Sequence, residues 1–177
     1  VIETPEKYYL SWKEKNQVEN PLLCSLEQLC RKGRLLEIIH DFTVFDAGIK
    51  KTCRHNQYFG VQASKKFVKK RQGGIIWHTQ GSGKSLTMVW LAKWLREHIE
   101  DSRVLIITDR TELDQQIEAV FKGVDENIYR TKSGSDLLSV LNKSEEWLIC
   151  SLIHKFGSSD EKNLDVFLKE QIGRAHV

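Results

Sequence analysis

From residue 56 onward, the chain alternates between short continuous apolar runs and longer stretches whose apolar residues recur every three or four positions. The runs within 103–109 and 146–152 are apolar at their centres, as parallel strands are when both faces of the sheet are covered. A third run, at 74–79, predicts another short buried strand. Helical stretches separate the runs, so the order predicts βαβ units joined by right-handed crossovers.

Four stretches with helical spacing accompany these runs. They are residues 56–74, 84–100, 110–121 and 134–143. The second is apolar around most of its girth, which predicts burial against a sheet. Core packing is therefore expected for three tryptophans on the strand and on this helix, Trp77, Trp90 and Trp94.

The helix at 56–74 is expected to bury one face and to expose the other. Phe59, Ala63 and Phe67 lie four residues apart and define the face expected to be buried. The opposite face carries a basic run, which we interpret as a solvated surface rather than a DNA-binding patch because no aromatic residues interleave with it. The run comprises Lys65, Lys66, Lys69, Lys70 and Arg71.

An arm precedes this α/β unit. Asn20 is in place to cap a helix whose first residue is Pro21, and Gly33 predicts its end. Its apolar positions at helical spacing are Leu22, Leu26 and Leu29. A second apolar segment, 34–42, follows, and Gly48 then predicts a turn.

Composition indicates a globular protein with one core of ordinary size. The 177 residues are 40% hydrophobic and 29% charged, and the net charge of +3 permits a nucleic-acid partner without requiring one. The four cysteines form no C-x-x-C pair, which predicts reduced thiols rather than zinc ligands or disulfides. No apolar run reaches the roughly 18 residues that a membrane span needs, and no signal peptide opens the chain, so we expect a cytoplasmic protein.

The segment "WHTQGSGKS", residues 77–85, predicts a phosphate-binding loop between a strand and a helix. Glycines let the backbone turn its N–H groups inward, and the helix start adds partial positive charge. Lys84 can contact the β- and γ-phosphates, and the Ser85 hydroxyl can ligate Mg²⁺. The residues predicted to bind the nucleotide here are Thr79, Gln80, Gly81, Ser82, Gly83, Lys84 and Ser85. The simpler alternative is a glycine turn without a ligand.

His78 stands where the G-x-x-x-x-G-K-[ST] pattern has its first glycine. Helicase-type motors often keep only the G-x-G-K-[ST] half of the pattern, so the change favours that class. His78 could serve as a catalytic base, but no neighbouring residue indicates a proton for it to accept. We therefore favour a packing or loop role for His78.

Four segments together resemble successive helicase motifs in the motor subunit of type I restriction endonucleases. They occur in the same order and at similar separations, and the resemblance covers Thr43 to Gly157: "FDAGIKKTCRHNQYFGVQA", "GGIIWHTQGSGKSLTM", "LIITDRTELDQQI" and "LICSLIHKFG". The resemblance implies an α/β P-loop NTPase fold, an incomplete RecA-like parallel sheet flanked by helices and preceded by a helical arm. It also implies a superfamily 2 motor that uses ATP and Mg²⁺ to translocate double-stranded DNA, in a complex with modification and specificity subunits.

The resemblance also implies a division of the chain. Residues 1–45 correspond to a helical arm between nuclease and motor regions, and 46–171 correspond to part of the first RecA-like domain. The last six residues, 172–177, read "IGRAHV", which a common sequencing adapter encodes when it is translated. We interpret these six residues as read-through and exclude them from the fold.

Two residues before the loop resemble the adenine-recognition motif of such motors. Gln57 matches the glutamine whose amide can donate to and accept from the N6–N7 edge of adenine. Arg54 matches the same motif and would support the glutamine or the nucleotide. The alternative for Gln57 is an exposed polar residue at a helix start.

The segment that begins at Asp109 resembles the motif that contacts the DNA backbone. Asp109, Arg110 and Thr111 follow a predicted strand at the carboxyl edge of the sheet, where Arg110 and Thr111 could bind phosphate oxygens. The alternative is that Asp109 caps the next helix and Arg110 forms a solvent-exposed ion pair. Two apolar residues of that helix are assigned to the core, Leu113 and Ile117.

The next motif along the chain leaves two interpretations open. Its polar residues could contact DNA or could belong to the core of the domain. They are Ser151, His154 and Lys155.

Several parts of a complete restriction motor do not occur in these 177 residues. They contain no D-E-x-H motif to hold magnesium and no nuclease signature of Pro-Asp with E-x-K, so negligible ATP turnover is expected from the chain alone. Two other classes remain open at this point: another P-loop enzyme such as a small-molecule kinase, and a non-catalytic DNA- or protein-binding module with the same fold.

Overall fold

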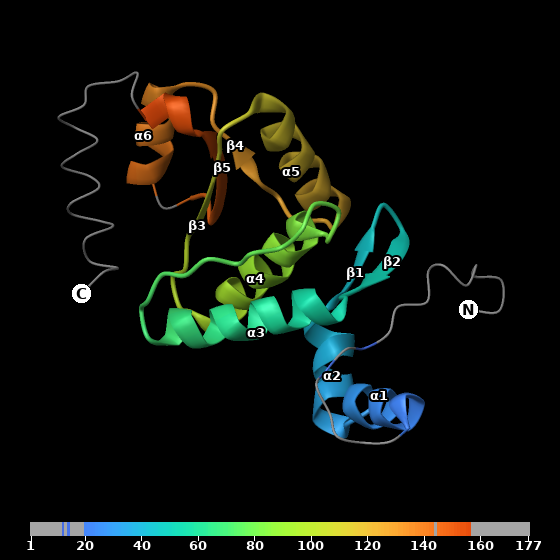
Figure 1. Ribbon diagram of the computed structural model, residues 1–177. Coiled ribbons are helices and arrows are strands. Elements are labelled where there is room, and N and C mark those ends of the chain that lie inside the picture. Colours follow the sequence, from blue (N-terminus) through green and yellow to red (C-terminus); the bar gives the residue numbers. More distant parts are fainter. Residues whose placement is uncertain (1–11, 13, 15–19, 144, 157–177) are drawn as a thin grey trace.

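The computed structural model describes residues 12, 14, 20–143 and 145–156, and the proposed read-through at 172–177 lies outside them (Figure 1). A helical arm comes first, then a β-hairpin, and then alternating helices and strands. The elements of the arm and hairpin are α1 Pro21–Leu29, α2 Lys32–Asp41, β1 Thr43–Asp46 and β2 Ile49–Thr52. Those of the α/β unit are α3 His55–Lys69, α4 Lys84–His98, β3 Val104–Thr108, α5 Thr111–Gly123, β4 Tyr129–Arg130, α6 Gly134–Asn142, β5 Leu148–Leu152 and the 3₁₀ turn η2 Ile153–Phe156.

A parallel sheet of three strands, in the order β3-β5-β4, forms the centre of the α/β unit. All five residues of the central strand β5 are buried, as its continuous apolar run predicts. The prediction of strands within 103–109 and 146–152 is confirmed. Strand β4 is not predictable from an apolar run because it contains only Tyr129 and Arg130. The α/β class is therefore confirmed, and the parallel sheet with its helices is compatible with a RecA-like fold.

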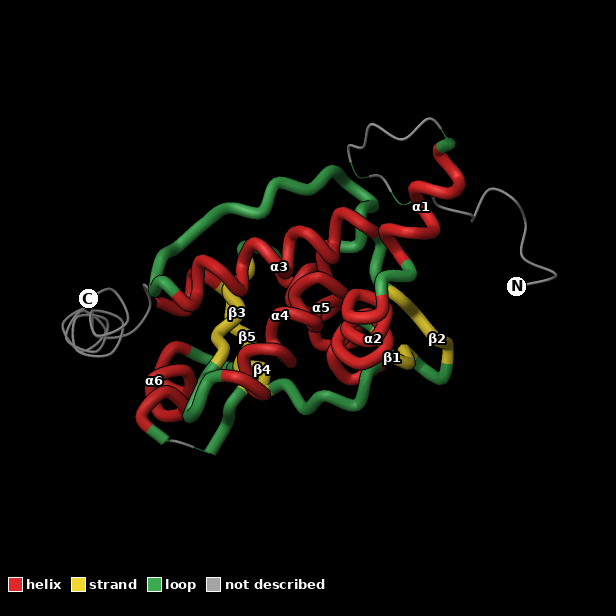
Figure 2. The backbone as a smooth tube through the Cα atoms, turned by 90° about the horizontal axis from the view of Figure 1, so that it is seen from below, coloured by secondary structure: helices red, strands yellow, loops and turns green. Residues whose placement is uncertain are grey.

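The helices α5 and α6 lie on opposite faces of this sheet (Figures 1 and 2). The chain passes from β3 through α5 to β4, and then returns in the opposite direction through α6 to the central strand β5. Because the two crossovers run in opposite directions, the same handedness places their helices on opposite faces. The arrangement covers both faces of the central strand.

Helix α3 lies alongside α4, and the main core forms between these helices, α5 and the sheet (Figure 1). Trp90 on α4 is 1% exposed and Trp94 is 5% exposed, which confirms their assignment to the core. The largest cluster of buried side chains includes Ile38, Phe42, Tyr58, Val61, Val89, Trp90, Phe121 and Leu148.

The predicted strand at 74–79 is wrong. No strand is assigned there, and Ile75 and Trp77 are 90% and 89% exposed, so Trp77 is not a core residue. A strand needs a neighbouring strand to pair its N–H and C=O groups. In the described part of the chain β3 pairs only with β5, and no strand pairs with 74–79. The apolar run therefore crosses the surface as a loop.

The buried face of α3 also differs from the prediction. Phe59 is 36% exposed and Phe67 is 47% exposed, whereas the buried residues are Gln57, Tyr58, Val61 and Lys65. The face turned toward α2 includes Lys65, whose Nζ lies 3.0 Å from Glu37 Oε1 and 3.3 Å from Asp41 Oδ2. Two carboxylates thus compensate the burial of one ammonium group. Lys65 does not belong to the solvated basic surface, and the other four members of the run are exposed.

In the arm, α1 starts as predicted and ends earlier. Asn20 Oδ1 accepts hydrogen bonds from the N–H groups of Leu22 and Leu23 at 3.0 and 3.1 Å, and Pro21 is the first helical residue. The helix ends at Leu29, the backbone has non-helical angles at Arg31 (φ −52°, ψ 126°), and Gly33 lies inside α2 rather than at a helix end. Cys24 and Gln28 are the buried residues of α1, and of the three leucines at helical spacing only Leu29 packs against the core, partly buried.

The turn predicted at Gly48 joins the antiparallel strands β1 and β2. Ala47 and Gly48 have φ angles of 49° and 80°, the left-handed values that a two-residue hairpin turn requires. The N–H of Ala47 donates to the carbonyl of Gly123 at 2.9 Å, so the hairpin contacts the end of α5.

All four cysteines are free thiols in the structure: Cys24, Cys30, Cys53 and Cys150. No helix in the described ranges has both the length and the apolar character that a membrane crossing needs.

The corrected positions of the tryptophans predict different effects for two substitutions. Trp77→Ala should change the free energy of unfolding by less than about 0.5 kcal/mol, since the side chain is in solvent. Trp90→Ala removes a buried aromatic side chain and should lower it by about 3–5 kcal/mol. Chemical denaturation of both variants measures the difference. A large loss for Trp77→Ala would show that the 74–79 run packs in the core after all.

Candidate functional site

The loop that precedes α4 has the backbone geometry of an anion-binding turn. Gly81 and Gly83 have φ angles of 75° and 82°, a region that glycine adopts without steric cost. Gly83 is the N-cap of α4, and no side chain caps the first N–H groups of the helix. The uncapped N–H groups and the helix dipole favour a negatively charged ligand at this end.

Hydrogen-bond donors converge on one carbonyl oxygen inside this loop. The Thr79 carbonyl accepts from Lys84 Nζ at 3.0 Å, from Ser82 Oγ at 2.7 Å and from the Ser82 N–H at 3.3 Å. Lys84 Nζ also lies 3.3 Å from the carbonyl oxygen of His78. A phosphate oxygen would offer the same donors a charged acceptor, which forms stronger hydrogen bonds than a neutral carbonyl.

Gln57 links the start of α3 to this loop. Its Oε1 accepts from the Arg54 N–H at 2.7 Å, and its Nε2 donates to the Gly83 carbonyl at 2.8 Å. Gln57 is 3% exposed, so the alternative of an exposed polar residue is wrong. A Cβ atom at Gly83 would collide with Gln57 Nε2 and would displace the amide, and the φ angle of 82° independently favours glycine there. Arg54 Nη1 lies 3.5 Å from the Gly81 carbonyl.

His78 packs against α3 rather than serving a recognisable proton relay. An added Cβ at Gly60 would lie 3.4 Å from the His78 ring, so the ring fits against the bare backbone of the helix. Its Nδ1 is buried without a hydrogen-bond partner, and a general base needs a group that orients it. The packing interpretation of His78 agrees with this geometry.

A cavity of about 560 Å³ joins the loop to the carboxyl end of β3. Lys84 and Ser85 line one side, and Thr108 and Asp109 line the other. Leu113 of α5 also lines the cavity and is 42% exposed, so its assignment to the core is wrong, whereas Ile117 is 6% exposed as predicted. Two of the predicted nucleotide residues, Lys84 and Ser85, and one of the predicted DNA residues, Asp109, therefore border one space.

The predicted DNA contacts lie where β3 passes into α5. Arg110 is the N-cap of α5 by position, but its side chain does not cap the helix, and Asp109 is not the cap. Arg110 Nε lies 3.6 Å from Asp109 Oδ2, and both side chains are largely exposed, at 74% and 67%. Such an exposed pair contributes little stability, so it does not prevent Arg110 from binding a phosphate.

The three polar residues of the last motif, one in β5 and two in η2, have different surroundings. Ser151 is fully buried, and its Oγ accepts from Thr131 Oγ1 at 2.9 Å, so Ser151 belongs to the core. Lys155 Nζ donates to the Thr131 carbonyl and lies 3.4 Å from Thr131 Oγ1. His154 is exposed. Of the two interpretations that the sequence leaves open, the core one holds for Ser151.

A buried carboxylate close to this region was missed by sequence reasoning. Asp114 on α5 is 0% exposed and accepts from Cys150 Sγ at 2.8 Å and from Arg130 Nε. Burial alone would raise the pKa of Asp114, but the hydrogen bonds from Cys150 and Arg130 outweigh it and lower the pKa. Burial and the neighbouring Asp114 raise the pKa of Cys150 to about 12, so it stays a thiol. The sequence signal was an aspartate three residues before the buried Ile117.

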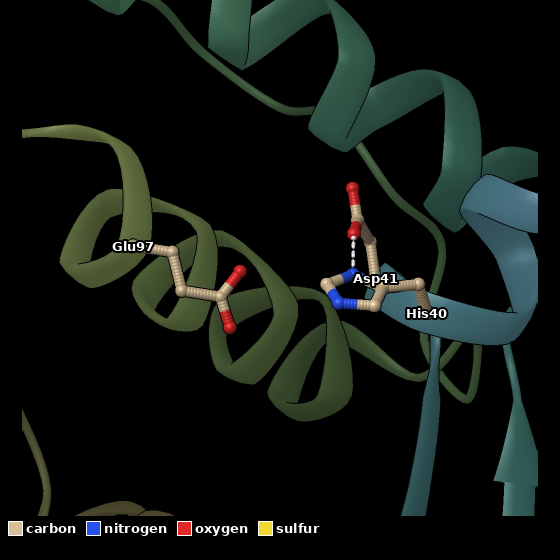
Figure 3. A group of neighbouring side chains, drawn as sticks. All are labelled: His40, Asp41 and Glu97. Carbon is tan, nitrogen blue, oxygen red and sulfur yellow. Dashed lines mark hydrogen bonds and ion pairs between the residues drawn. The ribbon is translucent and has the colours of Figure 1, made fainter.

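One group of potential metal ligands occurs in the described residues, at the end of α2 facing α4 (Figure 3). The ligand atoms of His40, Asp41 and Glu97 lie within 4.8 Å of one another. His40 Nδ1 is 2.6 Å from Asp41 Oδ1, and this contact, with the charges of Asp41 and Glu97, raises the pKa of His40. The other Asp41 oxygen pairs with Lys65. Because one Asp41 oxygen contacts the His40 ring and the other pairs with Lys65 of α3, we assign the group to polar contacts that join the helices.

Comparison with known proteins assigns the chain to a family. Residues 56–173, which make up more than half of the chain, match the SWI2/SNF2 ATPase family. The chain belongs to this family of ATPases. The match begins one residue before Gln57 and includes the glycine loop, β3, α5 and β5.

Individual relatives of the chain are named as subunits of type I restriction enzymes. The chain is 30% identical, over 99% of its length, to a protein of Methanocaldococcus jannaschii named as the type I restriction enzyme MjaIXP endonuclease subunit. It is 28% identical over 92% of its length to the type I restriction enzyme HindI endonuclease subunit of Haemophilus influenzae. A type I restriction enzyme endonuclease subunit of Staphylococcus aureus is also 28% identical, over 88% of the chain.

These relatives are much longer proteins. The chain spans 19% of the first, 18% of the second and 17% of the third. The similarity to type I restriction endonuclease subunits, which the sequence motifs predict, is confirmed over most of the chain.

The buried carboxylate predicts a pH-dependent effect. Because the folded pKa of Asp114 lies below its ordinary value, the ionised group stabilises the fold above that value, and this stabilisation disappears as the pH falls through the lowered pKa. Asp114→Asn should therefore lower the free energy of unfolding at pH 7 by about 1.5–3 kcal/mol, as expected for hydrogen bonds to a charged group. The difference from wild type should shrink toward pH 2. Urea denaturation across this range measures it, and a constant difference would contradict the charged role of Asp114.

Proposed function

We propose that this chain is the ATP-binding part of the DNA translocase of a type I restriction enzyme. It would contribute to the ATP-driven DNA translocation that precedes cleavage. The observation that carries the proposal is the convergence of Lys84 and Ser82 donors in a glycine loop, in a chain of the SWI2/SNF2 ATPase family. The names of the relatives support the restriction context.

In this proposal the loop holds the triphosphate. Lys84 moves from the Thr79 carbonyl to the β- and γ-phosphates, and the N–H groups at the start of α4 bind phosphate oxygens. Ser85, which lines the cavity, would ligate the Mg²⁺ ion that accompanies ATP. Thr79, Gln80, Gly81 and Gly83 supply backbone to the same cradle.

Gln57 and Arg54 are proposed to recognise adenine from the start of α3. Gln57 uses one oxygen lone pair and one N–H within the protein, and its amide has one further donor and one further acceptor position. Its bond to Gly83 would also transmit a displacement of the loop to α3. The base and the phosphates would then be coupled through one side chain.

Asp109, Arg110 and Thr111 are proposed to contact the backbone of double-stranded DNA from the far side of the cavity. Their exposure at the carboxyl end of β3 suits a contact with phosphates that carries no sequence preference. The DNA sequence would be recognised by a specificity subunit, and a modification subunit would complete the assembly. The motor region would comprise residues 46–171, with 1–45 as the arm toward a nuclease region.

Nucleotide binding by the 177-residue chain tests the role of the loop. Lys84→Ala should weaken the binding of ATP and GTP equally, by about 1.5–3 kcal/mol, since it removes a cation from the phosphates. Lys143→Ala makes the same charge change at an exposed site at the end of α6 and should have no effect. Calorimetric titration in Mg²⁺ gives both affinities. Equal affinities for wild type and Lys84→Ala would refute the phosphate site.

Base selectivity tests the role of Gln57. Gln57→Ala should reduce the preference for ATP over GTP by about 1–3 kcal/mol, as expected for a bidentate amide contact with adenine. The phosphate contacts stay in place, so GTP binding should change much less than ATP binding. If the variant keeps the wild-type preference, Gln57 acts only as the structural link between α3 and Gly83.

DNA binding tests the role of Arg110. Each phosphate contact that is lost should reduce the slope of log affinity against log salt concentration by about one. Arg110→Ala should therefore bind a fluorescent 30-base-pair duplex more weakly and with a shallower salt dependence than wild type, whatever the sequence of the duplex. Arg71→Ala, which removes an exposed arginine at the far end of α3, is the matched control. An unchanged slope for Arg110→Ala would remove Arg110 from the interface.

A further inference from the structure

We infer that Asp114 is a positioning residue for DNA binding: its buried contacts with Cys150 and Arg130 fix the direction in which the start of α5 presents Arg110. The inference rests on the proposed DNA contact at Arg110. It adds a role for three residues that lie behind that contact, on α5, β5 and β4.

Asp114 is connected to Arg110 through the helix backbone. The Asp114 N–H donates to the Arg110 carbonyl at 3.1 Å, which forms the first turn of α5. The Asp114 side chain is 0% exposed, whereas the Arg110 side chain is 74% exposed and, among the described residues, has only the exposed Asp109 within ion-pair distance. The turn thus has one anchored residue and one that projects into solvent. The direction of Arg110 depends on how firmly Asp114 is held.

Two strands hold the Asp114 carboxylate. Cys150 Sγ on β5 donates to Oδ1 at 2.8 Å, and Arg130 Nε on β4 donates to Oδ2. Arg130 Nη1 also lies 3.8 Å from Glu118, one turn further along α5. Contacts to two different strands fix both the rotation of α5 about its axis and its position along the sheet.

Strand β5 also fixes the end of β3, which lies just before this turn. Cys150 pairs with Ile106 of β3, and Leu152 pairs with Thr108, the residue that precedes Asp109. Arg110 therefore lies between two segments that β5 holds: the end of β3 by backbone pairing and the start of α5 by the Asp114 side chain.

Packing alone does not account for a carboxylate at this position. Burying an ionised group costs several kcal/mol in desolvation, and an apolar side chain of similar size avoids that cost. Hydrogen bonds differ from apolar contacts in having preferred angles, so they restrict the helix to one orientation. Compared with a well-packed apolar residue, the paired carboxylate therefore contributes a preferred orientation of the helix rather than additional stability.

The experiment separates positioning from stability. The probe is a fluorescent 30-base-pair duplex, and the 177-residue chain is titrated into it at several salt concentrations. Asp114→Asn and Cys150→Ala should both lower the salt slope by about one, as Arg110→Ala does. Cys150→Ser keeps a hydrogen-bond donor to Asp114 and should restore the wild-type slope. Phe121→Leu alters a buried apolar residue of the same helix and leaves the hydrogen bonds of Asp114 in place, so it should lower stability and leave the slope unchanged.

A double variant adds a direct test of the connection. If Asp114 acts through Arg110, then Asp114→Asn combined with Arg110→Ala lowers the slope no further than either change alone. A slope reduced by the sum of the two effects would overturn the inference.

Other outcomes assign failure to one proposal or the other. A wild-type slope in Asp114→Asn and in Cys150→Ala, together with a reduced slope in Arg110→Ala, overturns the positioning role and leaves the DNA contact standing. An unchanged slope in Arg110→Ala, or no DNA binding by the wild-type chain, refutes the proposed DNA contact and the inference with it. If Asp114→Asn does not fold, the pair Cys150→Ala and Cys150→Ser decides.

Discussion

The pairing of β5 with a parallel strand on each edge is the constraint on which the rest of the structure depends. All five of its residues are buried, so its backbone groups must find their partners in β3 and β4. This pairing determines where β3 ends and thus where the exposed residues 109–111 begin. Cys150 on the same strand donates a hydrogen bond to Asp114 of α5, so the sheet and the helix share a buried polar contact. The buried contacts of β5 therefore determine the position of the residues that border the cavity.

The sequence predicts those parts of the fold that are decided locally. The central strand β5 and its neighbour β3 have continuous apolar runs, and α4, α5 and α6 have helical spacing, so their positions follow from the pattern. The run at 74–79 has the same pattern but no partner strand, and a pattern of side chains cannot reveal whether the backbone finds a neighbour. The buried face of α3 was missed because Lys65 is neutralised by two carboxylates from α2.

For the candidate site, the spacing of residues in the sequence predicts the glycine loop but not the hydrogen bonds that connect the loop to other elements. Glycines at 81 and 83 followed by Lys84 identify the turn, and its φ angles agree. The hydrogen bond from Gln57 to Gly83 joins residues 26 positions apart, and only the packing of α3 beside the loop brings them together. Asp114 was hidden for a related reason: its partners, on β4 and β5, follow it in the chain, and no local motif connects them.

The surroundings of the four thiols make them chemically unequal. Cys24 and Cys150 are buried, and burial raises the pKa of both Cys53 and Cys150 to about 12, so neither offers a thiolate at neutral pH. Cys30, at the end of α1, is exposed. A maleimide dye should therefore attach to the arm of the folded protein without altering its sequence. Cys30 is therefore a natural attachment point for a dye that reports on the position of the arm.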